Sequence, residues 1–168
     1  MGVDSSLIEK LVNSVTAVLP NIKRFMMYTS ADTYGADAEY ARNGLVWSDF
    51  ERNVERFLSI PSSGGQVKLG FMVTYNVFSP PNFRRFLEYV LELKQRTADP
   101  DVRVYVDTNY IEAPEFLSLK VLDGRFLDVM VAYYEFMIQN KPFFNDVEIE
   151  KYRRCLEFMQ QITIDQAG

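Results

Sequence analysis

Residues 67–75 (VKLGFMVTY) constrain the fold more than any other stretch, because they are apolar at almost every position. Such a strand is typical of a parallel sheet, in which both faces are buried. Two similar stretches, residues 22–29 and 102–106, flank it along the chain, and a helical pattern precedes each of the three. This alternation predicts an α/β protein with a parallel sheet and right-handed crossovers.

The three predicted helices are recognised by apolar residues at helical spacing. The helices over residues 6–19 and 48–60 begin with Ser-x-x-Glu, the spacing of a capping box, at Ser6 and at Ser48. The third helix follows Ser79 as its cap, with Pro80 at its first position. The residues expected to bury the second helix are Trp47, Phe50, Val54 and Phe57.

The pattern becomes helical after residue 113, with helices predicted over residues 114–119, 124–139 and 146–162. No linker is long enough to divide the chain. We therefore expect a single domain over residues 1–168, made of a βα region (1–113) and a helical extension (114–168).

Composition argues against several kinds of site. The sequence has no histidine and one cysteine, Cys155, so these residues alone cannot form a disulfide, a Cys/His zinc site, a histidine triad or a cysteine-ligated cluster. Cys155 itself lies on the apolar stripe of the last predicted helix, where an inert buried thiol is expected.

The charge and hydropathy patterns argue against two classes of partner, nucleic acid and membrane. The net charge is −5 and Lys and Arg form no cluster, which argues against nucleic acid. No apolar run reaches the ~20 residues that span a membrane, and the first residues do not look like a signal peptide. We therefore expect a cytoplasmic protein that binds neither nucleic acid nor membrane.

Polar residues follow all three predicted strands. They are Ser30, Asp32, Glu39 and Arg42 after the first strand, Thr74 and Asn76 at the end of the second, and Asp107 and Asn109 after the third. Because the carboxyl ends of parallel strands meet at one edge of a sheet, these residues predict a ligand site there. Alternatively, Asp, Asn and Ser stand at strand ends because they form turns and helix caps.

Glu39 and Arg42 allow two interpretations. Three residues apart, they could form a surface ion pair, which contributes about 0.3–0.5 kcal/mol. Alternatively, Arg42 presents its two-pronged guanidinium to a ligand carboxylate while Glu39 orients it. In either case, replacing Arg42 with alanine is expected to cost less than about 1 kcal/mol of stability.

The same region contains three short motifs: Ser30-Ala31-Asp32, Glu39-Tyr40-x-Arg42-x-Gly44 and Trp47-x-x-Phe50-x-x-Asn53-Val54. Together with the later order of strands and helices, they resemble the middle of radical S-adenosylmethionine enzymes, closest to the branch with an accessory cluster domain. The likeness covers residues 22–122.

The resemblance implies half of a six-stranded partial TIM barrel that holds a [4Fe–4S] cluster and S-adenosylmethionine and generates a substrate radical. It implies Ser30 near the ribose, Arg42 near the methionyl carboxylate, and Asn76 and Asp107 at the opening of the site. Asp32, Glu39 and Thr74 complete the set expected to bind S-adenosylmethionine.

The chain departs from the family in lacking the CxxxCxxC loop and the glycine-rich segment of the first half-barrel, and Cys155 cannot replace three cysteines. It therefore looks like the carboxyl-terminal half of such an enzyme, either a truncated reading frame or a protein that has lost the catalytic half. Such a half would be inactive alone and would hold a cluster only if another chain supplied the cysteines. The alternative is a non-catalytic binding or assembly module that keeps the half-barrel. A hydrolase or transferase using Asp32 and Glu39 as acid and base is a weaker third interpretation.

The first predicted strand would form an open edge of this half-barrel. Only Lys23 and Arg24 supply the charges that discourage unwanted strand pairing. We therefore expect a partner chain or a second copy to add to this edge, unless the helix over residues 6–19 folds across it.

Overall fold

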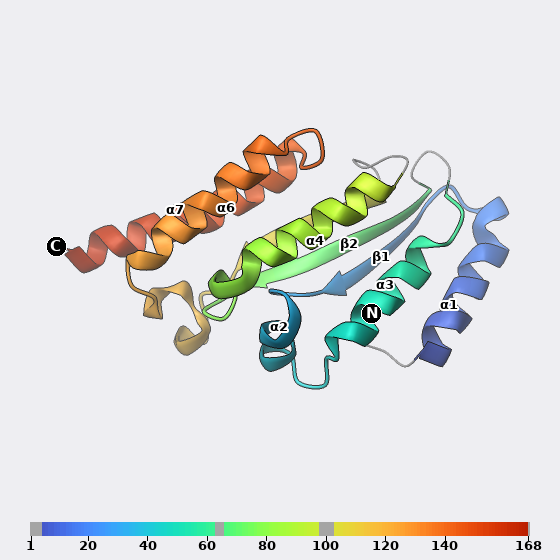
Figure 1. The fold of residues 1–168 in the computed structure, drawn as a ribbon, viewed down its shortest axis with the longest axis horizontal. Helices are drawn as coiled ribbons and strands as arrows, with labels where there is room; N and C mark the ends of the chain where they lie inside the picture. Colours follow the sequence, from blue (N-terminus) through green and yellow to red (C-terminus); the bar gives the residue numbers. More distant parts are fainter. Residues whose placement is uncertain (1–4, 63–65, 98–102, 168) are drawn as a thin grey trace.

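The computed structural model describes residues 5–62, 66–97 and 103–167. Its centre is a parallel sheet of three strands in the order β1-β2-β3 (Figure 1). The strands are β1 (Phe25–Ser30), β2 (Val67–Tyr75) and β3 (Val104–Tyr110). Phe25 pairs with Val67, and Leu69 pairs with Val104. The predicted α/β architecture and parallel sheet are confirmed.

Two strand boundaries differ from the prediction. β1 begins at Phe25 rather than at residue 22 and includes Ser30. β3 runs on to Tyr110 rather than ending at residue 106, so Asp107 and Asn109 lie within the strand, opposite Met72 and Thr74. Pairing with β2 overrides the low intrinsic preference of Asp and Asn for strands. The first residue of the predicted strand, Val102, lies outside the described residues.

The three predicted helices are present with shifted ends. They are α1 (Ser5–Val18), α3 (Trp47–Leu58) and α4 (Phe83–Arg96), with the 3-10 helices η1 (Leu19–Asn21) after α1 and η2 (Pro80–Asn82) before α4. A further helix, α2 (Gly35–Ala41), was not predicted. It starts at Gly35 with φ 61° and is followed by Gly44 with φ 84°, conformations that glycine adopts without strain.

The carboxyl-terminal region is helical as predicted, except at its start. Two 3-10 helices, η3 (Glu115–Leu117) and η4 (Leu119–Val121), replace the helix predicted over residues 114–119. α6 (Arg125–Gln139) and α7 (Asp146–Ala167) then pack against each other, and α7 lies against β3 (Figure 1).

The two predicted capping boxes are absent, and the predicted cap at Ser79 is present in position only. α3 begins at Trp47, so Ser48 lies inside it, and the backbone N–H of Trp47 donates to Glu39 Oε1 at 2.6 Å. Ser6 likewise lies inside α1. Ser79 is the N-cap residue of η2 and Pro80 follows it, as predicted, but the Ser79 hydroxyl accepts from the backbone N–H of Asn76 at 3.0 Å and not from an amide of the helix.

The sheet is buried on one face only, which corrects the expectation from residues 67–75. The buried residues of β2 on the side of α3 and α4 are Val67, Leu69, Phe71, Val73 and Tyr75. The residues between them lie on the other face of the sheet, where Lys68 and Met72 are half-buried and Thr74 is exposed. Gly70 lies beneath the ring of Tyr105, which would be 2.5 Å from a Cβ atom there. This second face, which also carries Met26 and Tyr28, is called the uncovered face below.

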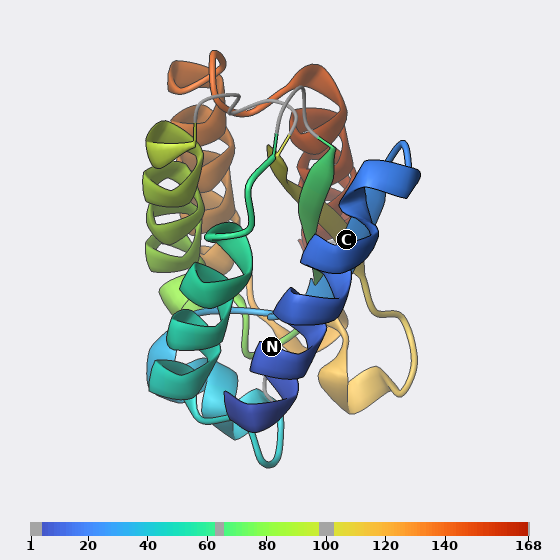
Figure 2. The same ribbon diagram turned by 90° about the vertical axis from the view of Figure 1, so that its right-hand side faces the viewer.

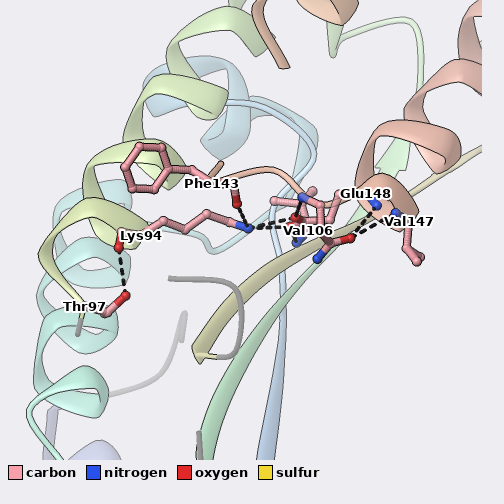
Figure 3. Close-up of polar contacts among 7 residues, drawn as sticks. Lys94, Thr97, Val106, Phe143, Val147 and Glu148 are labelled. Carbon is pink, nitrogen blue, oxygen red and sulfur yellow. Dashed lines mark hydrogen bonds and ion pairs between the residues drawn. The ribbon is translucent and has the colours of Figure 1, made fainter. Parts of the chain in front are cut away.

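A buried ion pair between α4 and α7 lies at the outer edge of β3 (Figure 3). Lys94 Nζ donates to both oxygens of Glu148 at 2.7 and 2.8 Å, and the two side chains are 0% and 3% exposed. The same carboxylate accepts from the backbone N–H groups of Val106 and Asn145, both at 2.8 Å. A β3 amide that faces away from the sheet is therefore satisfied by a side chain.

Candidate functional site

Asp32 joins the carboxyl ends of the first two strands. Arg42 Nη2 donates to Asp32 Oδ1 at 2.9 Å, and Arg42 Nε lies 2.9 Å from Asp32 Oδ2. The backbone N–H of Thr74 also donates to Asp32 Oδ1, at 2.8 Å. Asp32 is only 5% exposed. One interpretation of the sequence had the Arg42 guanidinium bind a ligand carboxylate. In the structure the guanidinium instead binds the buried carboxylate of Asp32.

The other residues at the ends of β1 and β2 also have internal partners. Glu39 caps α3 through Trp47 and does not serve to orient Arg42. Asn76 Nδ2 donates to the Thr74 carbonyl at 2.8 Å, while its Oδ1 accepts from the backbone N–H of Phe78 at 2.9 Å. These are the turn and capping roles that formed the alternative interpretation of the polar residues.

Asp107 lies apart from the Asp32–Arg42 pair. Its Oδ1 is 2.5 Å from Lys151 Nζ in α7, and it accepts from Asn109 Nδ2 at 3.0 Å. Ser30 ends β1 opposite Met72 and shares the uncovered face with Met26. The structure thus brings Asp32, Arg42 and Thr74 together and places Asp107 with α7.

A groove of about 480 Å³ runs along the uncovered face beside the first turns of α7. Its lining combines apolar, aromatic and charged side chains, among them Met26, Lys68, Tyr105, Asp107 and Lys151. Reasoning from strand ends missed Lys68 and Tyr105, because they lie inside strands. The sequence did contain a signal for this face: Lys68, Gly70, Met72 and Thr74 stand at every second position of an otherwise apolar strand, and such residues share one face of a sheet.

Several chemistries find no support in this arrangement. Within residues 5–62, 66–97 and 103–167, no group of three or more His, Cys, Asp or Glu residues could hold a metal ion. Asp32 and Glu39, considered as acid and base, both accept internal hydrogen bonds. Cys155 is 0% exposed, which confirms the predicted burial, and burial raises the pKa of its thiol to about 12.

The structure revises the effect expected from the sequence for replacing Arg42 with alanine, from less than about 1 kcal/mol to a loss of about 1–3 kcal/mol in the free energy of unfolding. The reason is that Asp32 would remain buried with only the Thr74 amide as a partner. Arg42 is 34% exposed, so solvent screening keeps the effect below that of a fully buried pair. Urea unfolding measures it. Arg52→Ala, which breaks an exposed ion pair with Asp49, should cost less than about 1 kcal/mol. Equal midpoints for the two variants would contradict a structural role for Arg42.

None of the described helices is long and apolar enough to cross a membrane. Comparisons with known protein families, with curated proteins and with solved structures find no match for this chain. A functional assignment therefore rests on the geometry above and on the resemblance of the three motifs.

Proposed function

We propose that this chain is one half of a β/α barrel of the radical S-adenosylmethionine type, inactive by itself and completed by a polypeptide that adds a strand to β1. The observation that carries the proposal is the difference between the two edges of the sheet. At the β3 edge α7 packs against the strand and Glu148 accepts from the Val106 amide, whereas no described strand pairs with the outer side of β1.

The outer side of β1 carries backbone groups suited to strand addition. The backbone N–H of Phe25 donates to the Gln66 carbonyl at 2.7 Å, and that of Ala31 donates to the Met72 carbonyl at 3.3 Å. Because amides alternate in direction along a strand, those of Met26, Tyr28 and Ser30 point away from β2. Such an edge favours pairing with another chain.

α1 does not replace the missing strand. It lies on the β1 side of the molecule, where it passes in front of β1 in Figure 2, and it packs mainly against α3. Its buried residues are Ile8, Val12 and Val15. Since the backbone groups within a helix bond to one another, α1 can shield β1 but cannot pair with it.

The uncovered face fits the inner wall of such a barrel. In β/α barrels the helices cover the outer face of the sheet and the other face turns inward. Here α3 and α4 cover one face, and the other carries Lys68, Tyr105 and Asp107 around the groove beside α7. In the completed barrel the other half would supply the cluster cysteines, and this half would supply one wall of the S-adenosylmethionine and substrate site.

A non-catalytic binding module is the second candidate, favoured by a specific observation. Asp32, Glu39, Arg42 and Asn76 all have internal partners, so these side chains already stabilise the fold without a cofactor. Both candidates use the β1 edge. They differ in whether the assembled complex holds an iron–sulfur cluster.

Iron and sulfide assays after anaerobic reconstitution separate the two functions. The chain alone should bind no cluster, because a [4Fe–4S] cluster needs several thiolates and Cys155 is buried. The chain co-purified with a polypeptide that carries the CxxxCxxC half should contain about four irons per complex. A stable complex without iron would favour the binding module. About four irons on the chain alone would contradict both.

A further inference from the structure

A second groove, of about 520 Å³, lies between α3 and α4, on the opposite side of these helices from the sheet. α3 contributes Glu51 and Glu55, and α4 contributes Tyr89 and Glu92. The remaining lining residues are Tyr34, Arg85, Gln95 and Arg96. We propose that this acidic, aromatic groove binds a primary ammonium group. This inference is independent of the barrel proposal.

Tyr89 is the first observation that points to a ligand. It is only 7% exposed, yet its hydroxyl has no hydrogen-bond partner among the described residues. The pKa of this hydroxyl is raised by burial and then by the charges of Glu51 and Glu55. Tyr89 itself lines the groove, together with both glutamates. Buried hydroxyl groups are almost always bonded, so an unpaired one calls for a partner.

The unpaired hydroxyl of Tyr89 belongs to an aromatic cluster. The ring centroid of Trp47, a residue that is 6% exposed, lies 4.6 Å from that of Tyr34 and 5.8 Å from that of Tyr89. Of these three aromatic residues, Tyr34 and Tyr89 line the groove.

The charged residues that line this groove favour a positively charged ligand. Three glutamates line the groove against two arginines, and one of these, Arg96, is paired with Glu55 at 2.5 Å. The guanidinium of the other, Arg85, lies 5.4 Å from the Tyr34 ring centroid, so this ring already accepts a positive charge. Aromatic faces attract cations, most strongly where solvent is excluded.

The arrangement favours an ammonium group over a metal ion. Within the described part of the chain, no three carboxylates come together closely enough to hold a metal. Glu51 already accepts from the Tyr34 hydroxyl at 3.0 Å, so its carboxylate is oriented in the groove. An ammonium group has three diverging donors and can bond to the Tyr89 oxygen and to separate carboxylates at once. A free diamine and a lysine side chain of a partner both carry this group.

The single tryptophan of the chain makes binding measurable, because Trp47 lies beside Tyr89. We would titrate the protein with cadaverine and with Nα-acetyl-lysine amide at low salt and follow tryptophan fluorescence. We expect a saturable change that Tyr89→Phe weakens about tenfold, since a hydrogen bond to a charged group is lost. Tyr89→Phe should fold as well as the wild type, because it removes an unpaired buried hydroxyl.

Glu51→Gln should also weaken binding, whereas Glu150→Gln, which changes an exposed glutamate of α7, should leave it unchanged. Tighter binding of cadaverine would identify a free diamine, and tighter binding of the lysine amide a protein partner. The absence of a saturable change, or equal affinity in Tyr89→Phe and the wild type, would overturn the proposal and leave water as the partner of this hydroxyl.

Discussion

Replacing Glu148 with alanine should lower the free energy of unfolding by about 3–5 kcal/mol, as expected when one member of a buried ion pair is removed. The substitution leaves Lys94 charged at a position with 0% exposure. It also removes the carboxylate that accepts from the Val106 and Asn145 amides. The bond to Val106 ties α7 to the edge of β3. Urea unfolding followed by circular dichroism would measure the loss.

Two further variants test the cause of this loss. Glu150→Ala, on the exposed side of the same helix, should change stability by less than about 1 kcal/mol. The double variant Lys94→Met/Glu148→Leu should be more stable than Glu148→Ala, because no buried charge is left unpaired. A Glu148→Ala midpoint within error of the wild type would contradict the buried ion pair.

Replacing Trp47 with alanine should cost about 3–5 kcal/mol, the range for truncating a large buried aromatic side chain. Trp47 is 6% exposed and stacks on Phe50, with ring centroids 5.0 Å apart and an interplanar angle of 26°. It also contacts Tyr34, so its removal opens a cavity between α3 and the segment after β1. Because the variant has no tryptophan, urea unfolding is followed by circular dichroism.

Tyr40→Ala is the control for Trp47→Ala. Tyr40 is 74% exposed and its ring meets only the edge of Phe78, at 5.2 Å between centroids, so its truncation should cost less than about 1 kcal/mol. Similar midpoints for the two variants would mean that α3 buries a different face.

The parts of the fold that follow from local periodicity could be predicted from the sequence. The apolar spacing of Trp47, Phe50, Val54 and Phe57 identified the buried face of α3, and all four residues are buried. α2 was missed because it has only seven residues and begins without a capping side chain. The extent of β3 was missed because the pairing of Asp107 with Met72 depends on the neighbouring strand.

The roles of polar residues depended on contacts that are distant in sequence. Strand ends correctly drew attention to Asp32, but its partners Arg42 and Thr74 are 10 and 42 residues away. Lys94 and Glu148 are 54 residues apart, and nothing local marks either one as buried. A sequence shows that a carboxylate is available, whereas its partner is decided by how the helices pack.

The outer side of β1 is the proposed pairing edge, and Tyr28→Pro tests it most directly. Tyr28 is 53% exposed, and its amide points away from β2, so proline removes an edge donor while keeping the bonds between β1 and β2. Tyr28→Ala keeps the amide and controls for the lost side chain. Met26→Lys adds a charge that discourages pairing at the same edge.

Light scattering over a range of concentrations gives the decisive measurement. We predict that the wild type and Tyr28→Ala self-associate, because a strand edge with unpaired backbone groups favours pairing with a second copy. Tyr28→Pro and Met26→Lys should remain monomers of 19.5 kDa with near-native melting curves. A wild type that stays a 19.5 kDa monomer at high concentration would contradict the open edge and, with it, the half-barrel.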